Sequence, residues 1–247
     1  KEGIVKAYIR SFKPTVHEPV IRFETPPGQQ MQVDFTTIKR GRTKLKGFVA
    51  TLGYSRASYV RFSEYEKQED WLAGIEGALH YFGGVPNEIL FDNAKCIMLE
   101  RDAYGEGQHR WNSKLLHLSA DYGFRLRACR PYRAKTKGKV ERFNGYLKSS
   151  FITPLAASLK QARLTLDVEV ANGQIGPWLD EVAHQRIHGT TMQKPAELLI
   201  KEKLVLSELT PQPLETPRIY HTTQLPVPIE SFHHPLSTYD QLIEVTL

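Results

Sequence analysis

The sequence has little of what marks disulfide-rich, membrane or ATP-hydrolysing proteins. Only two of its 247 residues are cysteines, Cys96 and Cys129, too few for a disulfide scaffold, and they do not form a metal-binding pair. We find no signal peptide and no apolar run long enough to span a membrane. A glycine-rich phosphate loop is also missing, so we expect no ATP hydrolysis by this chain. These absences favour a globular protein of a reducing cytoplasm.

What the chain does have is a local concentration of positive charge. The segment Arg125–Arg142 contains eight basic residues and one acid, whereas the rest of the chain contains 25 basic and 26 acidic residues. The net charge of +6 therefore comes from a single segment. A basic patch on an otherwise neutral protein predicts a polyanionic partner, and nucleic acid is the first candidate.

The one acid of this segment, Glu141, lies on a predicted helix. An apolar stripe recurs there with helical spacing, formed by Val140, Phe143, Leu147 and Phe151. Glu141 lies at the shoulder of the stripe, where its carboxylate can point at the edge of whatever the helix packs on. For an isolated glutamate, a solvated side chain paired with basic neighbours would be the better interpretation.

Two aspartates in strand-like runs change that judgement. Asp34 interrupts the alternating run Gln30–Thr37, and an aspartate inside a strand is disfavoured and rarely buried unless it is paired or bound to a metal. Asp92 follows the apolar run Ile89–Phe91 and, taken alone, would be a turn residue. Together with Glu141, these acids form a set that can hold two divalent ions for phosphoryl transfer.

The three acids resemble the DDE triad of integrases and transposases that have a ribonuclease H-like core. Further motifs are similar to those of IstA-type transposases, from bipartite bacterial insertion sequences that also encode an IstB helper ATPase. These motifs are Asp92-Asn-Ala-Lys95, the block from Pro131 to Asn144 with Lys148 after it, and His184-Gln-Arg-Ile-His188 followed by Pro195-Ala-Glu-Leu198. The resemblance covers roughly Pro27 to Leu199.

The resemblance implies a two-metal-ion polynucleotidyl transferase. Asp34, Asp92 and Glu141 would bind two Mg²⁺ or Mn²⁺ ions, and the enzyme would nick transposon ends and transfer the 3′-hydroxyl into target DNA. The basic residues expected to hold DNA phosphates are Arg133, Lys135, Lys137, Lys139, Arg142 and Lys148.

The same resemblance implies a set of partners. These are transposon-end DNA with its terminal inverted repeats, target DNA, an IstB-like AAA+ ATPase helper, and at least one further copy of the chain in a synaptic complex. No membrane is involved, and the expected location is the bacterial cytoplasm, with association to the nucleoid when the protein is bound to DNA.

The predicted fold is α/β, a ribonuclease H-like mixed five-stranded sheet flanked by helices. The expected strands are Gln30–Ile38, Leu45–Leu52, Ser58–Tyr65, Pro86–Phe91 and Phe124–Cys129, and the expected helices are Gln68–Phe82, Trp111–Tyr122 and Lys137–Phe151. The first three strands should be antiparallel, and Asp34 and Asp92 should lie on adjacent strands. Cys96–His109 is predicted to be a mobile loop near the site. His109 in this loop could be a ligand or a proton relay, but a surface residue at a helix entry is the favoured interpretation.

Composition suggests three segments along the chain. Residues 1–26 resemble a linker from a missing N-terminal DNA-binding module, 27–206 the catalytic domain with extra C-terminal helices, and 207–247 a Pro-rich tail. The extra helices should be interrupted at Asn172–Pro177 and then continue through His184, Arg186 and His188, whose roles stay open between an ordinary surface helix and support of the site. The tail is either a disordered terminus or a docking segment.

Two other functions are compatible with the same residues. One is a metal-dependent nuclease with this core that does not join strands, which an assay of strand transfer with pre-cut ends would distinguish. The other is a nucleic-acid-binding module without activity, in which the acids are structural. Such a module should show no Mn²⁺ site that uses all three acids.

Overall fold

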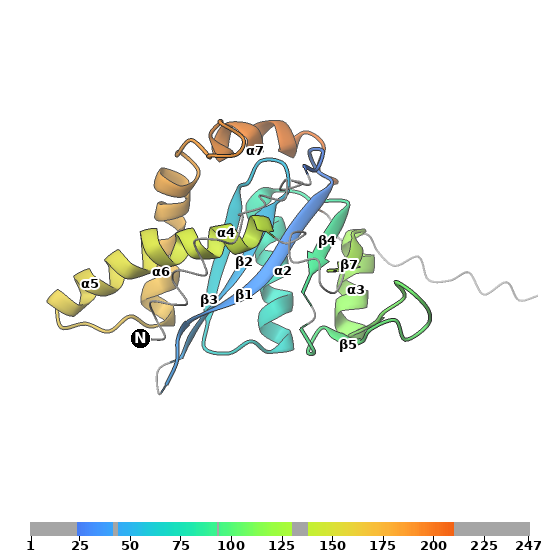
Figure 1. Cartoon of the computed structure of the whole chain (residues 1–247), viewed down its shortest axis with the longest axis horizontal. Coiled ribbons are helices and arrows are strands. Elements are labelled where there is room, and N and C mark those ends of the chain that lie inside the picture. Colours follow the sequence, from blue (N-terminus) through green and yellow to red (C-terminus); the bar gives the residue numbers. More distant parts are fainter. Residues whose placement is uncertain (1–23, 42–43, 93, 130–137, 210–247) are drawn as a thin grey trace, which may run out of the picture. The chain divides into compact units, whose positions relative to one another are not determined.

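A five-stranded sheet organises the computed structural model, which describes residues 24–41, 44–92, 94–129 and 138–209 (Figure 1). The strand order is β3-β2-β1-β4-β7. The strands are β1 (Gln30–Lys39), β2 (Leu45–Leu52), β3 (Ser58–Ser63), β4 (Glu88–Phe91) and β7 (Arg125–Ala128). The first three are antiparallel, and β4 and β7 continue the sheet in parallel on the other side of β1. The predicted mixed sheet is thereby confirmed.

Helices cover both faces of this sheet. Helices α2 (Gln68–Phe82) and α3 (Ser113–Tyr122) pack on one face, and α4 (Gly138–Leu147) and α6 (Val168–Trp178) on the other, so α4 crosses in front of the sheet in Figure 1. Two hydrophobic cores result, one for each face, because strand side chains alternate between faces. Among the described residues, no helix is long and apolar enough to cross a membrane.

Helix α2 has the bounds that its apolar stripe predicts. The stripe residues Trp71, Ile75, Ala78, Leu79 and Phe82 are all buried to within 1% exposure. Gly83 ends the helix in the left-handed conformation, at φ 71°, which glycine adopts without steric cost. The helix lies so close to β2 that a Cβ on Gly74 would stand 2.5 Å from the Phe48 ring.

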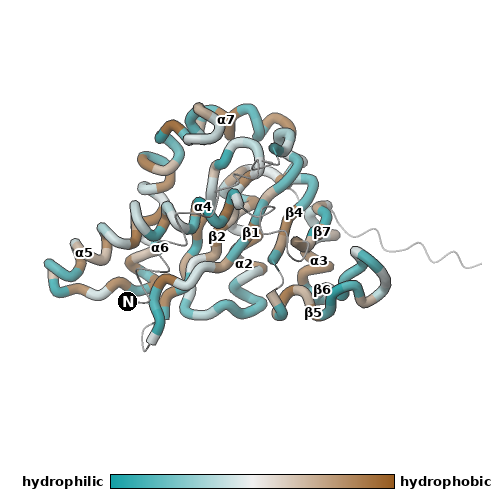
Figure 2. The backbone as a smooth tube through the Cα atoms, in the orientation of Figure 1, coloured by the Kyte–Doolittle hydropathy of each residue, from teal (hydrophilic) through white to brown (hydrophobic). Residues whose placement is uncertain are grey.

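The predicted loop between Cys96 and His109 is partly wrong, because it contains a short strand. Met98–Glu100 (β5) pairs antiparallel with Arg110–Trp111 (β6). Trp111 therefore belongs to a strand and not to the following helix. Helix α3 begins at Ser113 because the Asn112 side chain caps it, accepting a hydrogen bond from the Lys114 N–H. Figure 2 shows that the loop joining β5 to β6 is hydrophilic.

The helix that carries Glu141 is longer than its apolar stripe predicts. After Leu147 the chain continues through a π-helical turn, Lys148–Ile152, into α5 (Thr153–Gln161). Phe151 and Ile152 in this turn are buried against the core shared with α6.

The predicted break at Asn172–Pro177 is also wrong, since α6 runs through it. Asn172 pairs with the edge strand β3, its side chain accepting from the Phe62 N–H at 2.8 Å and donating to the Phe62 carbonyl at 3.0 Å. Ala171 and Ile175 are buried on the same helix. This packing outweighs a helix propensity cost of about 1 kcal/mol for glycine and about 3 kcal/mol for proline. A second π-helical turn, Leu179–Ala183, begins directly after Trp178, the last residue of α6.

The last described helix is α7 (Pro195–Lys203), and the residues after it contact the sheet. Beyond it, Ser207 forms two backbone hydrogen bonds with Val85, which precedes β4. The chain divides into two compact units at Pro213, and the described residues belong to the first of them.

Candidate active site

Asp34 lies in the middle of β1 on the face that α4 covers. It is half-buried, and its Oδ2 accepts a hydrogen bond of 2.8 Å from the Asn144 side-chain amide of α4. Two residues earlier on the same face, the Gln32 side chain accepts from the Val140 N–H at 3.4 Å. These two contacts attach the first turns of α4 to the central strand.

Asp92 follows β4 directly and is exposed. The parallel register pairs Gln32 of β1 with Leu90 of β4. Continued by two residues, this register would set Asp92 opposite Asp34. Because β1 and β4 are paired, the strand that carries Asp34 and the strand that Asp92 follows are adjacent, as predicted. Neighbouring strands lie about 4.8 Å apart.

Glu141 lies in the first turn of α4 and is exposed. It comes one residue after Val140 and three before Asn144, the two residues that attach the helix to β1. The helix that carries the third acid is therefore attached to the strand that carries the first. Among the described residues, however, no three His, Cys, Asp or Glu side chains gather closely enough to hold a metal ion.

The chemistry of this donor set suits a divalent cation such as Mg²⁺ or Mn²⁺, because all three candidates are hard oxygen ligands. Asn144 of α4, which donates to Asp34, is itself buried, at 8% exposure. Its Oδ1 is buried and has no hydrogen-bond partner within the described part of the chain. An acceptor oxygen of this kind, beside the Asp34 carboxylate, fits a cation or a water bound to one.

Asn144 is the site residue that the sequence analysis missed. It stands four residues after Val140, among the apolar positions of the α4 stripe, where an amide needs a partner. That position was a signal that could have identified it.

The residues predicted to bind DNA have three different placements. Arg133, Lys135 and Lys137 lie outside the described residues. Arg142 on α4 and Lys148 at the start of the π-helical turn are exposed. Lys139, in contrast, turns inward.

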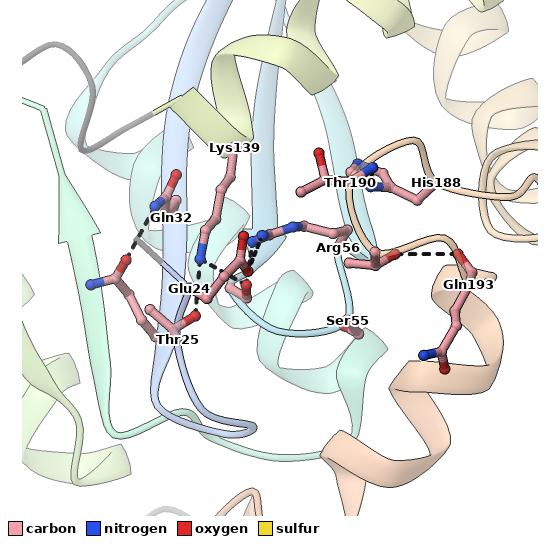
Figure 3. A network of polar contacts seen from close by, with 12 residues as sticks. Glu24, Thr25, Gln32, Ser55, Arg56, Lys139, His188, Thr190 and Gln193 are labelled. Atoms are coloured by element: carbon pink, nitrogen blue, oxygen red, sulfur yellow. Dashed lines mark hydrogen bonds and ion pairs between the residues drawn. The ribbon is translucent and has the colours of Figure 1, made fainter. Parts of the chain in front are cut away.

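Lys139 belongs to a polar cluster at the turn between β2 and β3 (Figure 3). Its ammonium donates to the Gly53 carbonyl at 2.8 Å and to the Thr25 hydroxyl at 3.0 Å. Burial lowers the pKa of Lys139 to about 8, and the nearby charge of Arg56 contributes to the shift. The structure thus gives this lysine partners within the chain, and its predicted phosphate contact stays a prediction.

Arg56 is the centre of the same cluster. It is 6% exposed and has a φ of 64°, a left-handed conformation that is uncommon outside glycine. Its guanidinium donates to the Gly53 carbonyl and, at 2.6 Å, to the Glu24 carboxylate. Desolvation lowers the pKa of Arg56, and Glu24 opposes that shift.

His184, Arg186 and His188 do not lie on a surface helix, because the helix ends at Ala183. His184 is buried, and its Nε2 accepts from the Ser58 N–H at 3.0 Å. The Arg186 guanidinium stacks over the Tyr146 ring, 3.4 Å from its centroid. Burial, followed by the charges of Arg56, Arg186 and Arg142, lowers the pKa of His188 to about 4. His184 and Arg186 thus connect the chain after α6 to β3 and α4, whereas His188 makes local contacts, its Nδ1 accepting from the Thr190 N–H at 3.2 Å.

His109 is neither a surface residue at a helix entry nor part of a described ligand group. Its ring packs edge-on against Trp111, with centroids 5.9 Å apart. Its Nδ1 accepts from the Asp102 N–H at 3.0 Å, which closes the loop between β5 and β6.

Comparison with known proteins identifies the family. Residues 24–134 match the model of the integrase core domain. The chain is 38% identical over 207 residues to the putative transposase for insertion sequence element IS5376 of Geobacillus stearothermophilus, a match that covers 81% of this chain and 49% of that protein. It is 36% identical over 170 residues to the transposase for insertion sequence element IS21 of Pseudomonas aeruginosa, covering 67% of this chain and 41% of the relative. The chain thus spans about half the length of these relatives or less.

Solved structures agree on the fold. One chain of the simian T-cell lymphotropic virus intasome, solved in complex with the PP2A regulatory subunit B56 gamma, matches with a TM-score of 0.53 at 20% identity, over 77% of this chain and 59% of that chain. The HTLV-2 integrase catalytic core domain in complex with magnesium, in its trimeric form, matches with a TM-score of 0.51 at 17% identity, over 71% of this chain and 99% of that chain. The fold is therefore the ribonuclease H-like fold of retroviral integrase cores. The sequence matches show that the chain belongs to the family of insertion-sequence transposases with an integrase core domain, the IstA-type transposases.

Proposed function

We propose that this chain is the catalytic core of a DDE transposase, which nicks transposon ends and transfers their 3′-hydroxyl into target DNA. One observation carries the proposal. Asp34 and Asp92 come from paired parallel strands, and the helix that bears Glu141 is attached to β1 through Asn144 and Asp34 itself.

Asp34, Asp92 and Glu141 are the residues that would hold the metal ions. Two bound Mg²⁺ or Mn²⁺ ions supply the activation of the attacking oxygen and the stabilisation of the leaving oxygen. Asn144 holds the Asp34 carboxylate in one orientation through its 2.8 Å hydrogen bond. Because Arg142 and Lys148 are exposed near this helix, they can hold the phosphates on either side of the reacting one.

Two successive displacements describe the reaction. In the first, a water oxygen attacks the phosphorus, the bond to the 3′-oxygen breaks, and that oxygen takes up a proton to give a free 3′-hydroxyl. In the second, this hydroxyl loses its proton and attacks a phosphorus of target DNA, displacing a target 3′-oxygen. No covalent bond to the protein forms in either displacement.

The partners of the proposed reaction follow from the family. They are transposon-end DNA, target DNA, an IstB-like helper ATPase, and a second copy of the chain, because two ends must be held together. The intasome matched above is an assembly of an integrase relative, which supports a multimeric form of this protein also.

Single substitutions of the three acids test the proposal. Asp34→Asn, Asp92→Asn and Glu141→Gln in the full-length protein should each reduce cleavage and joining by roughly three or more orders of magnitude, and double variants should be little worse, because the acids act as a unit. Glu181→Gln, at an exposed glutamate after α6, is the matched control. Mn²⁺ binding measured by calorimetry should weaken with the activity.

Two outcomes would decide against the proposal. Normal Mg²⁺-dependent activity in any of the three variants would remove that residue from the site. If the wild-type protein cleaves ends but fails to join pre-cut ends to target DNA, the chain is a nuclease and not a transposase.

A further inference from the structure

A second basic surface lies away from the segment that holds the excess charge. A groove with a volume of about 530 Å³ opens where the β1–β2 hairpin meets the end of β3, and we call it the hairpin groove. Its basic lining residues are Lys39, Arg40, Lys44, Lys46 and Lys67. Two acids, Glu64 and Glu66, lie among them.

Most of this positive charge is not neutralised within the described residues. The ion pair of the groove joins Lys46 to Glu66 at 2.8 Å. The other four cations face a single remaining acid, Glu64, and among described residues none of the four has an ion pair within 4.0 Å. The groove therefore carries an excess of three positive charges in a small space.

An exposed tyrosine orders two of these lysines. The ammonium of Lys67 lies 4.7 Å from the centroid of the Tyr65 ring, and that of Lys44 lies 5.2 Å from it. Both lysines and the ring are exposed, the tyrosine at 45%. Tyr65 thus holds two cations at one ring without cancelling their charge, an arrangement that suits a ligand with repeating negative groups.

The groove lies at the end of the sheet where the candidate active site opens. Lys39 is five residues beyond Asp34 on β1, which corresponds to about 17 Å along a strand. From the other side, the Asn112 side chain donates to the Gln68 side chain at 2.8 Å and to the Cys96 carbonyl at 3.3 Å. Gln68 directly follows Lys67 of the groove, so Cys96, four residues after Asp92, lies near the groove.

We propose that the hairpin groove binds the phosphate backbone of the DNA whose reacting phosphate lies at Asp34 and Asp92. The inference rests on the proposed function, since it takes the DNA to be present at that end of the sheet. A separation of about 17 Å corresponds to roughly five base pairs of duplex at 3.4 Å each. The groove extends the DNA contact surface beyond the basic segment, on residues from another part of the chain.

Binding by a cleavage-deficient protein tests this surface. In an Asp92→Asn background, Lys44→Gln with Lys67→Gln is compared with Lys160→Gln plus Lys201→Gln, exposed lysines on α5 and α7 that give the same change in charge. The probe is a fluorescent DNA duplex of arbitrary sequence, because binding to the phosphate backbone does not depend on sequence. The groove pair should weaken affinity roughly tenfold and flatten the slope of log affinity against log salt by about 0.9 for each phosphate that the variant no longer neutralises.

The alternatives have separate outcomes. Equal affinities and slopes for the groove pair and the control pair would overturn the proposal. So would a loss of binding to polyglutamate with unchanged binding to the duplex, since that would indicate an acidic protein partner. Failure of the wild-type protein to cleave DNA, with the groove effect intact, would contradict the proposed function but not the groove. Unchanged melting temperatures would show that the variants are folded.

Discussion

The chain holds two groups of basic residues that are built in opposite ways. In the cluster of Arg56 and Lys139, each cation is desolvated and donates to groups of its own chain. In the hairpin groove, Lys44 and Lys67 are exposed and are ordered by Tyr65. The first group stabilises the fold, and the second keeps its charge available to a ligand. A basic residue therefore indicates a DNA contact only when its surroundings leave its hydrogen-bonding capacity unused.

The largest difference between the two groups should be a loss of folding stability when Arg56 is replaced. Arg56→Ala should lower the free energy of unfolding by about 2–3 kcal/mol, because it removes a buried guanidinium that donates to both the Gly53 carbonyl and the Glu24 carboxylate. The Gly53 carbonyl keeps its hydrogen bond from Lys139. The ion pair itself adds little to this figure, since Glu24 is 57% exposed. Urea unfolding of the whole chain measures the change.

A matched variant isolates the backbone part of that effect. Arg56→Gly removes the same hydrogen bonds but suits the φ of 64°, so it should be more stable than Arg56→Ala by about 1 kcal/mol. Equal stability of the two variants would mean that the left-handed conformation contributes nothing.

A smaller effect should appear as a dependence of stability on pH. The pKa of His188 is lowered to about 4 from an ordinary value of 6.5, so between these values the unfolded chain binds a proton that the folded chain does not. Stability contributed by neutral His188 should thus be complete above pH 6.5 and fall as the pH decreases toward 4. Melting temperatures of the wild type and His188→Gln, compared at several pH values, should converge in acid. Parallel curves would contradict the prediction.

The smallest effect on stability should be at the groove. Lys44→Gln and Lys67→Gln together should change the free energy of unfolding by within about 0.5 kcal/mol, because both side chains are exposed. The same variant is the one expected to bind DNA more weakly, so urea unfolding and DNA titration should give opposite rankings for Arg56 and the groove lysines. A groove variant that unfolds as easily as Arg56→Ala would remove the contrast between the two groups.

Where local pattern and tertiary packing agree, the sequence predicted the structure well. The apolar stripe of α2 and the apolar run of β2 predicted the bounds of both elements, because the structure buries these residues. The antiparallel pairing, which the structure confirms, came with the ribonuclease H-like fold that the family resemblance implies. The placement of Asp34 and Asp92 on adjacent strands followed from the same resemblance and not from periodicity.

Contacts between distant segments account for the failures. Asn172 predicted a break because an asparagine before a glycine favours a turn, yet its amide pairs with Phe62 on the edge of the sheet. The sequence also did not reveal that the Lys139 ammonium lies against Gly53 and Thr25, more than 80 residues away along the chain, while its predicted contact with DNA stays a prediction. Periodicity carries no information about such partners. Asn144 was visible in the sequence as an amide among apolar positions, but its hydrogen bond with Asp34 was not.

One buried carboxylate determines where this domain can be divided. Glu202 of α7 is fully buried, and its two oxygens accept from the Gly28 N–H at 3.1 Å and the Ser55 N–H at 2.9 Å. The last described helix thus binds both the entry to the first strand and the turn between the second and third. A fragment that stops after Glu141 contains every candidate catalytic carboxylate but leaves two buried amides without acceptors, at a cost of about 1–3 kcal/mol each. Within the described residues, α7 therefore belongs to the smallest fragment that keeps these buried amides hydrogen-bonded, although it carries none of the three candidate acids.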